Sequence, residues 1–256
     1  MRLPRIQLFA RPTPGQGIAL LLLSLAAFGY PLLGAWAIEQ FGTPATSAVL
    51  LAVAVAGWGL RSAVEGRPGW LLLQNAGALV LLGLAAATGD RTYLLLFPAL
   101  INLYLAVIFA GSLATEQSIV ERGARILQPY LPPFTVAYCR KLTLFWAAFF
   151  VANTGWIGAL ALGPAEAWRN YTVVAYPLSI GAISAVEFVV RKVWFRYYTE
   201  APFDRLLAAI WPAEANERGR RSQHYVATLR AAGYGPGGEH SGEPLDPAVI
   251  AELTQG

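Results

Sequence analysis

One acidic residue, Glu187, lies within a long apolar segment and is followed four residues later by Arg191. On a helix this spacing puts both side chains on one face, where they can form an ion pair. An ionisable group in an apolar segment is costly to bury, so it indicates a proton or cation site or a contact for a charged lipid headgroup. The alternative, which we favour, is a structural ion pair near the membrane interface, with Arg191 extended towards lipid phosphate.

Carboxamide side chains lie in three further apolar segments, as Gln74, Asn75, Asn102 and Asn153. In one interpretation they line a polar path through a membrane. More often such amides bridge neighbouring helices, and each typically contributes less than about 1 kcal/mol. We favour the structural role, and Asn102 and Asn153 are the candidates for the functional one.

The tract Tyr138-Cys139-Arg140-Lys141 precedes the fifth apolar segment and follows Arg122 and Arg125. These cations can hold an anionic lipid headgroup or an acyl-phosphate-like substrate. In the alternative interpretation, which we favour, Arg140 and Lys141 only set the orientation of the next helix through their positive charge.

Residue types that enzymes use for catalysis are sparse in this chain. The single cysteine, Cys139, cannot form an intramolecular disulfide or a thiolate metal cage. Both histidines lie in the polar C-terminal region, and no Walker loop, G-x-S-x-G elbow or H-E-x-x-H motif occurs. We therefore predict no catalytic residue, no metal site and no cofactor, and a function that is not enzymatic.

The apolar residues are concentrated in runs long enough to cross a bilayer. Hydrophobic residues make up 56% of the 256 residues and charged residues only 13%, whereas a soluble domain has about 25% charged residues. Each run holds roughly 18 to 24 residues, enough for a hydrocarbon core of about 30 Å. The sequence thus predicts an all-α, polytopic transmembrane domain over 16–196, with six helices at about 16–39, 44–61, 69–89, 92–114, 143–163 and 171–195.

Lysine and arginine are segregated between alternate loops. Of the 19 basic residues, all but Arg91 and Arg169 lie at the termini, between the second and third or fourth and fifth predicted helices, or around the end of the sixth. Cytoplasmic segments of membrane proteins carry such an excess. The sequence predicts a multi-pass protein of the bacterial inner membrane with both termini in the cytoplasm. The basic residues cluster beside apolar runs, which indicates lipid headgroups and not nucleic acid as the partner.

Three segments outside the predicted helices are expected in the cytoplasm. Residues 1–15 form an N-terminal arm. Residues 118–128 form a short amphipathic helix on the leaflet, with Ser118 and Glu121 at capping-box spacing. Residues 197–256 form a polar, partly flexible tail.

The predicted tail contains several local signals. Asp204 is expected to cap a short amphipathic helix, a polar helix is expected over 214–232, and the glycine-rich stretch 233–238 is expected to be a flexible linker. Asp246-Pro247 can start a last helix. At the other end of the chain, Ala35-Trp36-Ala37 also fits a signal-peptide cleavage site, an alternative in which the first helix is removed.

A central block of the sequence is distinctive, and its residues are the stretch 118–127 (Ser-Ile-Val-Glu-Arg-Gly-Ala-Arg-Ile-Leu), Leu131-Pro132-Pro133, Tyr138, Arg140-Lys141, Thr143, Trp146, Phe149-Phe150 and Asn153. With Phe97-Pro98, Asn102 and the stretch 187–191, this block resembles a family of uncharacterised bacterial inner-membrane proteins. The resemblance covers roughly residues 15–196.

Members of that family often accompany biosynthetic genes for aryl polyene or xanthomonadin-type pigments. The resemblance therefore implies a membrane accessory role in the biosynthesis or assembly of a lipid-linked polyene. Its expected partners are membrane lipids and cytoplasmic acyl-chain biosynthetic enzymes. Two alternatives are a small transporter or flippase for an anionic lipid-like cargo and a membrane-embedded acyl- or glycosyl-transferase.

Overall fold

The computed structural model describes residues 14–65, 68–127, 130–196, 202–234, 239–240 and 243–255. In these ranges all regular secondary structure is helical, as predicted. The chain divides into two compact units. Unit 1 comprises Met1–Ile119 with Lys141–Ser179, and unit 2 comprises Val120–Arg140 with Ile180–Gly256.

Four helical stretches among the described residues are long and apolar enough to cross a membrane, namely Trp36–Leu60, Thr92–Ser112, Pro133–Ala161 and Ala165–Phe195. A fifth apolar stretch, Asn75–Thr88, is shorter. By length and composition the chain therefore has the make-up of a membrane protein.

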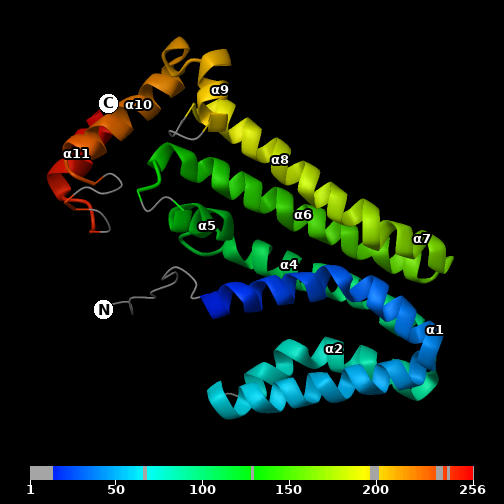
Figure 1. The fold of residues 1–256 in the computed structure, drawn as a ribbon. Helices are drawn as coiled ribbons and strands as arrows, with labels where there is room; N and C mark the ends of the chain where they lie inside the picture. The colour runs from blue at the N-terminus through cyan, green and yellow to red at the C-terminus, as the bar shows by residue number, and fades with distance from the viewer. Residues whose placement is uncertain are drawn as a thin grey trace. The chain divides into compact units, whose positions relative to one another are not determined.

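The first helical stretch, α1 (Pro14–Glu65), consists of two helices joined at a corner. Gly42 there has φ 76° and ψ 162°, a conformation that interrupts the helix and that glycine alone adopts readily. The ribbon reverses its direction within α1 (Figure 1). The corner falls in the gap that the sequence predicted between helices 16–39 and 44–61.

The next helix, α2 (Pro68–Thr88), packs along the second arm of α1 (Figure 1). Leu82 and Ala85 on α2 are buried, and Leu50 and Ala54 on α1 pack against them. Apolar contact of this kind holds the two helices together in unit 1. The position of α2 agrees with the third predicted helix.

The fourth predicted helix is present but interrupted, as α3 (Thr92–Leu95) and α4 (Phe97–Ser112). The interruption is at Leu96, two residues before Pro98, which lacks a backbone N–H and cannot complete the helical hydrogen-bond pattern. At the start of α3, the backbone N–H of Thr92 donates to Asp90 Oδ1 at 2.8 Å. This bond lowers the pKa of the Asp90 carboxyl, because it stabilises the charged form.

The chain then continues through a short helix, a long helix and a composite helix. These elements are α5 (Ile119–Leu127), η1 (Pro133–Thr135), α6 (Val136–Ala161), α7 (Ala165–Asn170), the π-helical turn η2 (Tyr171–Ala175) and α8 (Tyr176–Phe195).

Two predicted helix starts are wrong by six or seven residues. α6 begins at Val136 and not at Thr143, because Pro133 opens a single 3-10 turn that leads directly into the helix. Arg140 and Lys141 therefore lie within the helix and not before it. The last composite helix begins at Ala165, because α7 and the π turn extend it at its start.

The C-terminal region is largely helical. Its elements are α9 (Pro202–Ile210), η3 (Ala213–Ala215), α10 (Glu217–Ala231) and α11 (Pro247–Gln255). Tyr225 and Leu229 of α10 form a buried cluster with Tyr234, against which Val249 and Leu253 of α11 pack. Tyr234 belongs to the stretch predicted as a flexible linker, yet it is only 7% exposed; residues 235–238 lie outside the described residues.

We predict that Gly42→Ala lowers the free energy of unfolding by about 1–3 kcal/mol, because the Cβ of alanine makes a positive φ sterically unfavourable. Gly57→Ala is the matched control in the same helix. Gly57 is helical with open space around a built Cβ, so this change should be neutral or stabilise by roughly 0.5–1 kcal/mol. Thermal or detergent unfolding of the purified protein measures both. Equal stability of the two variants would contradict a strained corner at Gly42.

Candidate functional site

Glu187 on α8 lies between two partners in unit 2. Arg191 Nε is 3.4 Å from Glu187 Oε1, and the Tyr138 hydroxyl donates to the same oxygen at 3.3 Å. The Glu187 side chain is 16% exposed and that of Arg191 is 38% exposed. The predicted pairing of Glu187 with Arg191 is present, and Tyr138 of α6 is an additional partner that the spacing rule did not identify.

The Tyr138 ring is held by aromatic contacts near the end of α8. It packs edge-on against Phe195 at 5.4 Å between ring centroids, and Phe134 lies 6.0 Å from Phe195. The Phe195 carbonyl accepts a hydrogen bond of 2.6 Å from Ser222 of α10. The group around Glu187 is therefore fixed by α6, α8 and α10.

A second ion pair joins α8 to α9. Lys192 Nζ lies 2.7 Å from Asp204 Oδ2, and the two side chains are 16% and 3% exposed. Asp204 lies in the first turn of α9, and its carboxylate accepts from Lys192 across two helices. A short, largely buried and charge-assisted hydrogen bond fixes the position of α9 against the end of α8.

A third ion pair lies within α5, where Arg125 Nη2 is 2.8 Å from Glu121 Oε1. A helix is present where the sequence predicted one over 118–128, and Glu121 is buried in it. Ile126, in contrast, is 43% exposed. The first backbone N–H of α5, that of Ile119, donates to Ser112 Oγ at 3.0 Å.

Arg140 and Lys141 occupy the second turn of α6, where Arg140 is half-buried and Lys141 is exposed. Arg140 is turned by about 200° around the helix from Tyr138. It therefore lies on the other side of α6 from the hydroxyl that contacts Glu187.

In unit 1, Asn102 and Asn153 are 1% and 4% exposed. Asn102 Nδ2 donates to the Pro98 carbonyl at 2.9 Å, and Asn102 Oδ1 accepts from the Tyr176 hydroxyl at 2.7 Å. Asn153 has the matching arrangement: it donates to the Phe149 carbonyl at 2.8 Å and accepts from the Tyr171 hydroxyl. Both amides thus bond within the protein on each side, as the structural interpretation expects.

The π-helical turn explains how the two tyrosines serve the two asparagines. Tyr171 and Tyr176 are five residues apart, and the Tyr176 N–H bonds to the Tyr171 carbonyl. In an α-helix these positions would be about 140° apart, but an i to i+5 bond stacks them on one side. Their ring centroids are 6.3 Å apart. From this one face Tyr171 reaches α6 and Tyr176 reaches α4.

A tryptophan adds another bond to the same contact region. Trp168 of α7 is buried, and its Nε1 donates to the Leu95 carbonyl of α3 at 2.9 Å. Leu95 and Trp168 share a core cluster with Ile157 and Ala161 of α6. Asn75 is half-buried in α2, and the side chain of Gln74 lies outside the described residues.

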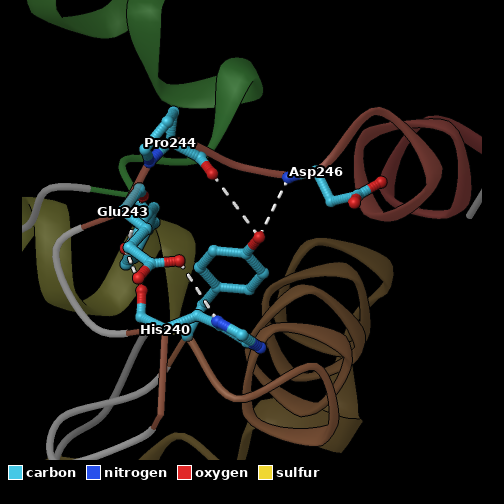
Figure 2. Close-up of polar contacts among 6 residues, drawn as sticks. His240, Glu243, Pro244 and Asp246 are labelled. Carbon is cyan, nitrogen blue, oxygen red and sulfur yellow. Dashed lines mark hydrogen bonds and ion pairs between the residues drawn. The ribbon is translucent and has the colours of Figure 1, made fainter.

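In unit 2, the segment before α6 is tied to the C-terminal region. The Tyr130 hydroxyl donates to the carbonyls of His240 and Glu243 at 3.1 and 2.8 Å, and its ring meets that of Tyr234 at 5.4 Å. The Tyr234 hydroxyl bonds the Pro244 carbonyl and the backbone N–H of Asp246 at 3.4 and 3.0 Å. Figure 2 shows His240, Glu243, Pro244 and Asp246 gathered around these bonds.

Among the residues that the structure describes, no three histidine, cysteine, aspartate or glutamate side chains are grouped as metal ligands. Cys139 is buried and packs with Ala124 and Leu131. Glu121, Glu187 and Asp204 each pair with a cation, and the Lys192–Asp204 pair joins two helices. No family model, curated protein or solved structure matches the chain.

We predict that Asn102 and Tyr176 are energetically coupled in unit 1. A double-mutant cycle with Asn102→Leu and Tyr176→Phe should give a coupling free energy of about 0.6 kcal/mol and at most about 1.7 kcal/mol, as for other interhelical hydrogen bonds in membranes. Unfolding in mixed micelles measures it. Tyr104→Phe is the matched control, because Tyr104 lies on α4 with Asn102 and is exposed. Additive effects of the two substitutions would argue against the bond.

We predict that Asp204→Asn destabilises the protein by about 3 kcal/mol, because it leaves the Lys192 charge largely buried without its counter-ion. Glu243→Gln breaks a pair with His240 in which both side chains are exposed, so its effect should stay within about 0.5 kcal/mol. Chemical denaturation of the intact protein compares the two. The Lys192–Asp204 pair would be energetically unimportant if both substitutions had the same small effect.

Proposed function

We propose that the chain crosses a bacterial inner membrane six times, with both termini and the part of unit 2 that follows α8 in the cytoplasm. The four long apolar stretches supply four crossings, and the first arm of α1 together with α2 supplies the other two. The loops at Arg91 and Arg169 then face the periplasm, and every other basic residue faces the cytoplasm or its interface. This distribution follows the positive-inside rule.

The contact between Tyr130 and the C-terminal region is the single observation that carries the proposal. Two segments that touch must lie on one side of a bilayer. Tyr130 precedes α6, and its partners His240 and Glu243 follow α8. An even number of crossings must therefore separate them, which supports one crossing for α6 and one for the composite helix that ends with α8.

We further propose a non-enzymatic accessory role in the biosynthesis or assembly of a lipid-linked, aryl polyene-like product. Unit 2 serves in it as a docking platform for cytoplasmic acyl-chain enzymes and their acidic carrier protein. One face of α10 is buried in unit 2 through Ser222, Tyr225 and Leu229. Arg220 and Arg221 on the same helix are exposed, and such a basic surface favours acidic partners.

The topology is tested with reporter fusions at Asp90, at Pro164 and at the C-terminus. A reporter active only in the periplasm should be active at the first two positions and silent at the third. A reporter that fluoresces only in the cytoplasm should give the reverse pattern. Fusions that place the C-terminus and Asp90 on the same side would overturn the six-crossing arrangement.

The docking role is tested by crosslinking and co-purification from intact membranes of the native strain. We expect an acyl-chain enzyme or carrier protein with the wild-type protein, and at least a tenfold loss with the double variant Arg220→Glu, Arg221→Glu, since like charges across an interface repel. Arg169→Glu, on the proposed periplasmic side, is the matched control and should retain the partner. Recovery of no such partner with the wild-type protein would contradict docking.

A deletion strain separates assembly from transport. Loss of all lipid-linked product, measured by lipid extraction and mass spectrometry, is the outcome that docking and assembly predict. Accumulation of finished product on the cytoplasmic side would instead indicate a transporter.

A further inference from the structure

Helix α9 has an apolar stripe that unit 2 leaves uncovered. Phe203, Leu206 and Ile210 are 44%, 57% and 56% exposed, whereas Asp204 and Leu207 are 2% and 5% exposed. At 100° per residue, the three exposed side chains fall within about 60° of one another around the helix. The stripe is therefore a continuous ridge of large apolar side chains, and its centre lies about 100° around α9 from the buried side chains of Asp204 and Leu207.

The structure holds this ridge near the end of a candidate membrane span. α9 begins seven residues after Phe195, the last residue of α8. Lys192, in the last turn of α8, binds Asp204 in the first turn of α9 at 2.7 Å. Arg196 Nη1 donates to the Pro212 carbonyl at 2.5 Å, just beyond the end of α9. α9 is thus fastened at both ends to the last residues of the span.

The surroundings of the ridge fit a lipid interface better than a protein surface. Trp194 at the end of α8 and Trp211 after α9 are 49% and 37% exposed, and tryptophan concentrates at the level of the lipid headgroups. Arg205 is exposed and lies about 135° around α9 from the centre of the stripe. A helix with one apolar side and a cationic side towards water is typical of helices that lie in the membrane plane.

We propose that α9 lies in the cytoplasmic interface of the bilayer that α8 crosses, with Phe203, Leu206 and Ile210 inserted among the phospholipid acyl chains. This inference rests on the proposed membrane crossing of α8. It assigns the interfacial role to α9, whereas the sequence assigned it to residues 118–128. In α5, Ala124 and Glu121 are buried, and Ile126 is the one large apolar side chain that is described and exposed.

The intact protein allows a direct test, because Cys139→Ala removes its single cysteine. Spin labels are placed one at a time at Leu206, at Ile210 and at Arg205, which is exposed on the cationic side of α9. The labelled protein is reconstituted in vesicles of phosphatidylethanolamine and phosphatidylglycerol. Collision with oxygen, which concentrates in lipid, is then compared with collision with a water-soluble nickel chelate.

The proposal predicts that oxygen collisions exceed nickel collisions several-fold at Leu206 and Ile210, and that this ratio is inverted at Arg205. Equal access of the nickel chelate to all three positions would overturn it, since α9 would then lie in water. Low access of both reagents at Leu206 and Ile210 would also overturn it, because protein would then cover the ridge.

A label at Val151 separates failure of this inference from failure of the proposed membrane crossing. Val151 is 59% exposed on α6, within one of the four candidate spans. A lipid signal at Val151 together with a water signal at Leu206 would refute the placement of α9 alone. A water signal at Val151 would refute the crossing itself.

Discussion

Hydrocarbon offers no hydrogen-bond partner, so a polar group within a membrane-crossing helix must find its partner in the protein itself. In unit 1 this constraint is met by paired side chains on three helices. Asn102 and Asn153 each donate to their own helix and accept from a tyrosine on the composite helix of α7 and α8. Because each amide is satisfied on both sides, these bonds fix which faces of α4 and α6 meet that helix. The same bonds leave neither amide exposed to a passing cargo, which weakens the case for a polar path at these residues.

In unit 2 the carboxylates that are shielded from solvent are instead neutralised by nearby cationic side chains. Glu187, Asp204 and Glu121 each pair with a cation at 2.7–3.4 Å. The pairs differ in what they join. Glu187–Arg191 and Glu121–Arg125 lie within single helices, whereas Lys192–Asp204 spans two. The last pair joins α9 to the end of a candidate span, and the bonds of Tyr130 tie the segment before α6 to the C-terminal region.

Sequence reasoning located the helices well because apolar run length is a local property. It placed the corner of α1 and the start of α11 within a few residues, and it paired Glu187 with Arg191 from their spacing alone.

It failed where long-range contacts decide the outcome. Tyr138 and Glu187 are 49 residues apart, and Tyr130 and His240 are 110 apart. Tyr234 was assigned to a linker because glycines surround it, although its ring is buried against α10 and α11. The hydrophobic pattern of the sequence also does not reveal the π turn. The five-residue spacing of Tyr171 and Tyr176, next to Pro177, is the one feature of the sequence that indicates it.

The corner at Gly42 bears on how the chain is inserted during synthesis. In the proposed topology the two arms of α1 are consecutive crossings joined by a single non-helical residue. Glu39 is the one charged side chain near that corner, so almost nothing hydrophilic has to be translocated there. The two arms can therefore insert into the bilayer together as a helical hairpin. Insertion of the second arm does not then require that the first arm has already been inserted on its own. Lengthening the corner with charged residues would remove this route and require stepwise translocation.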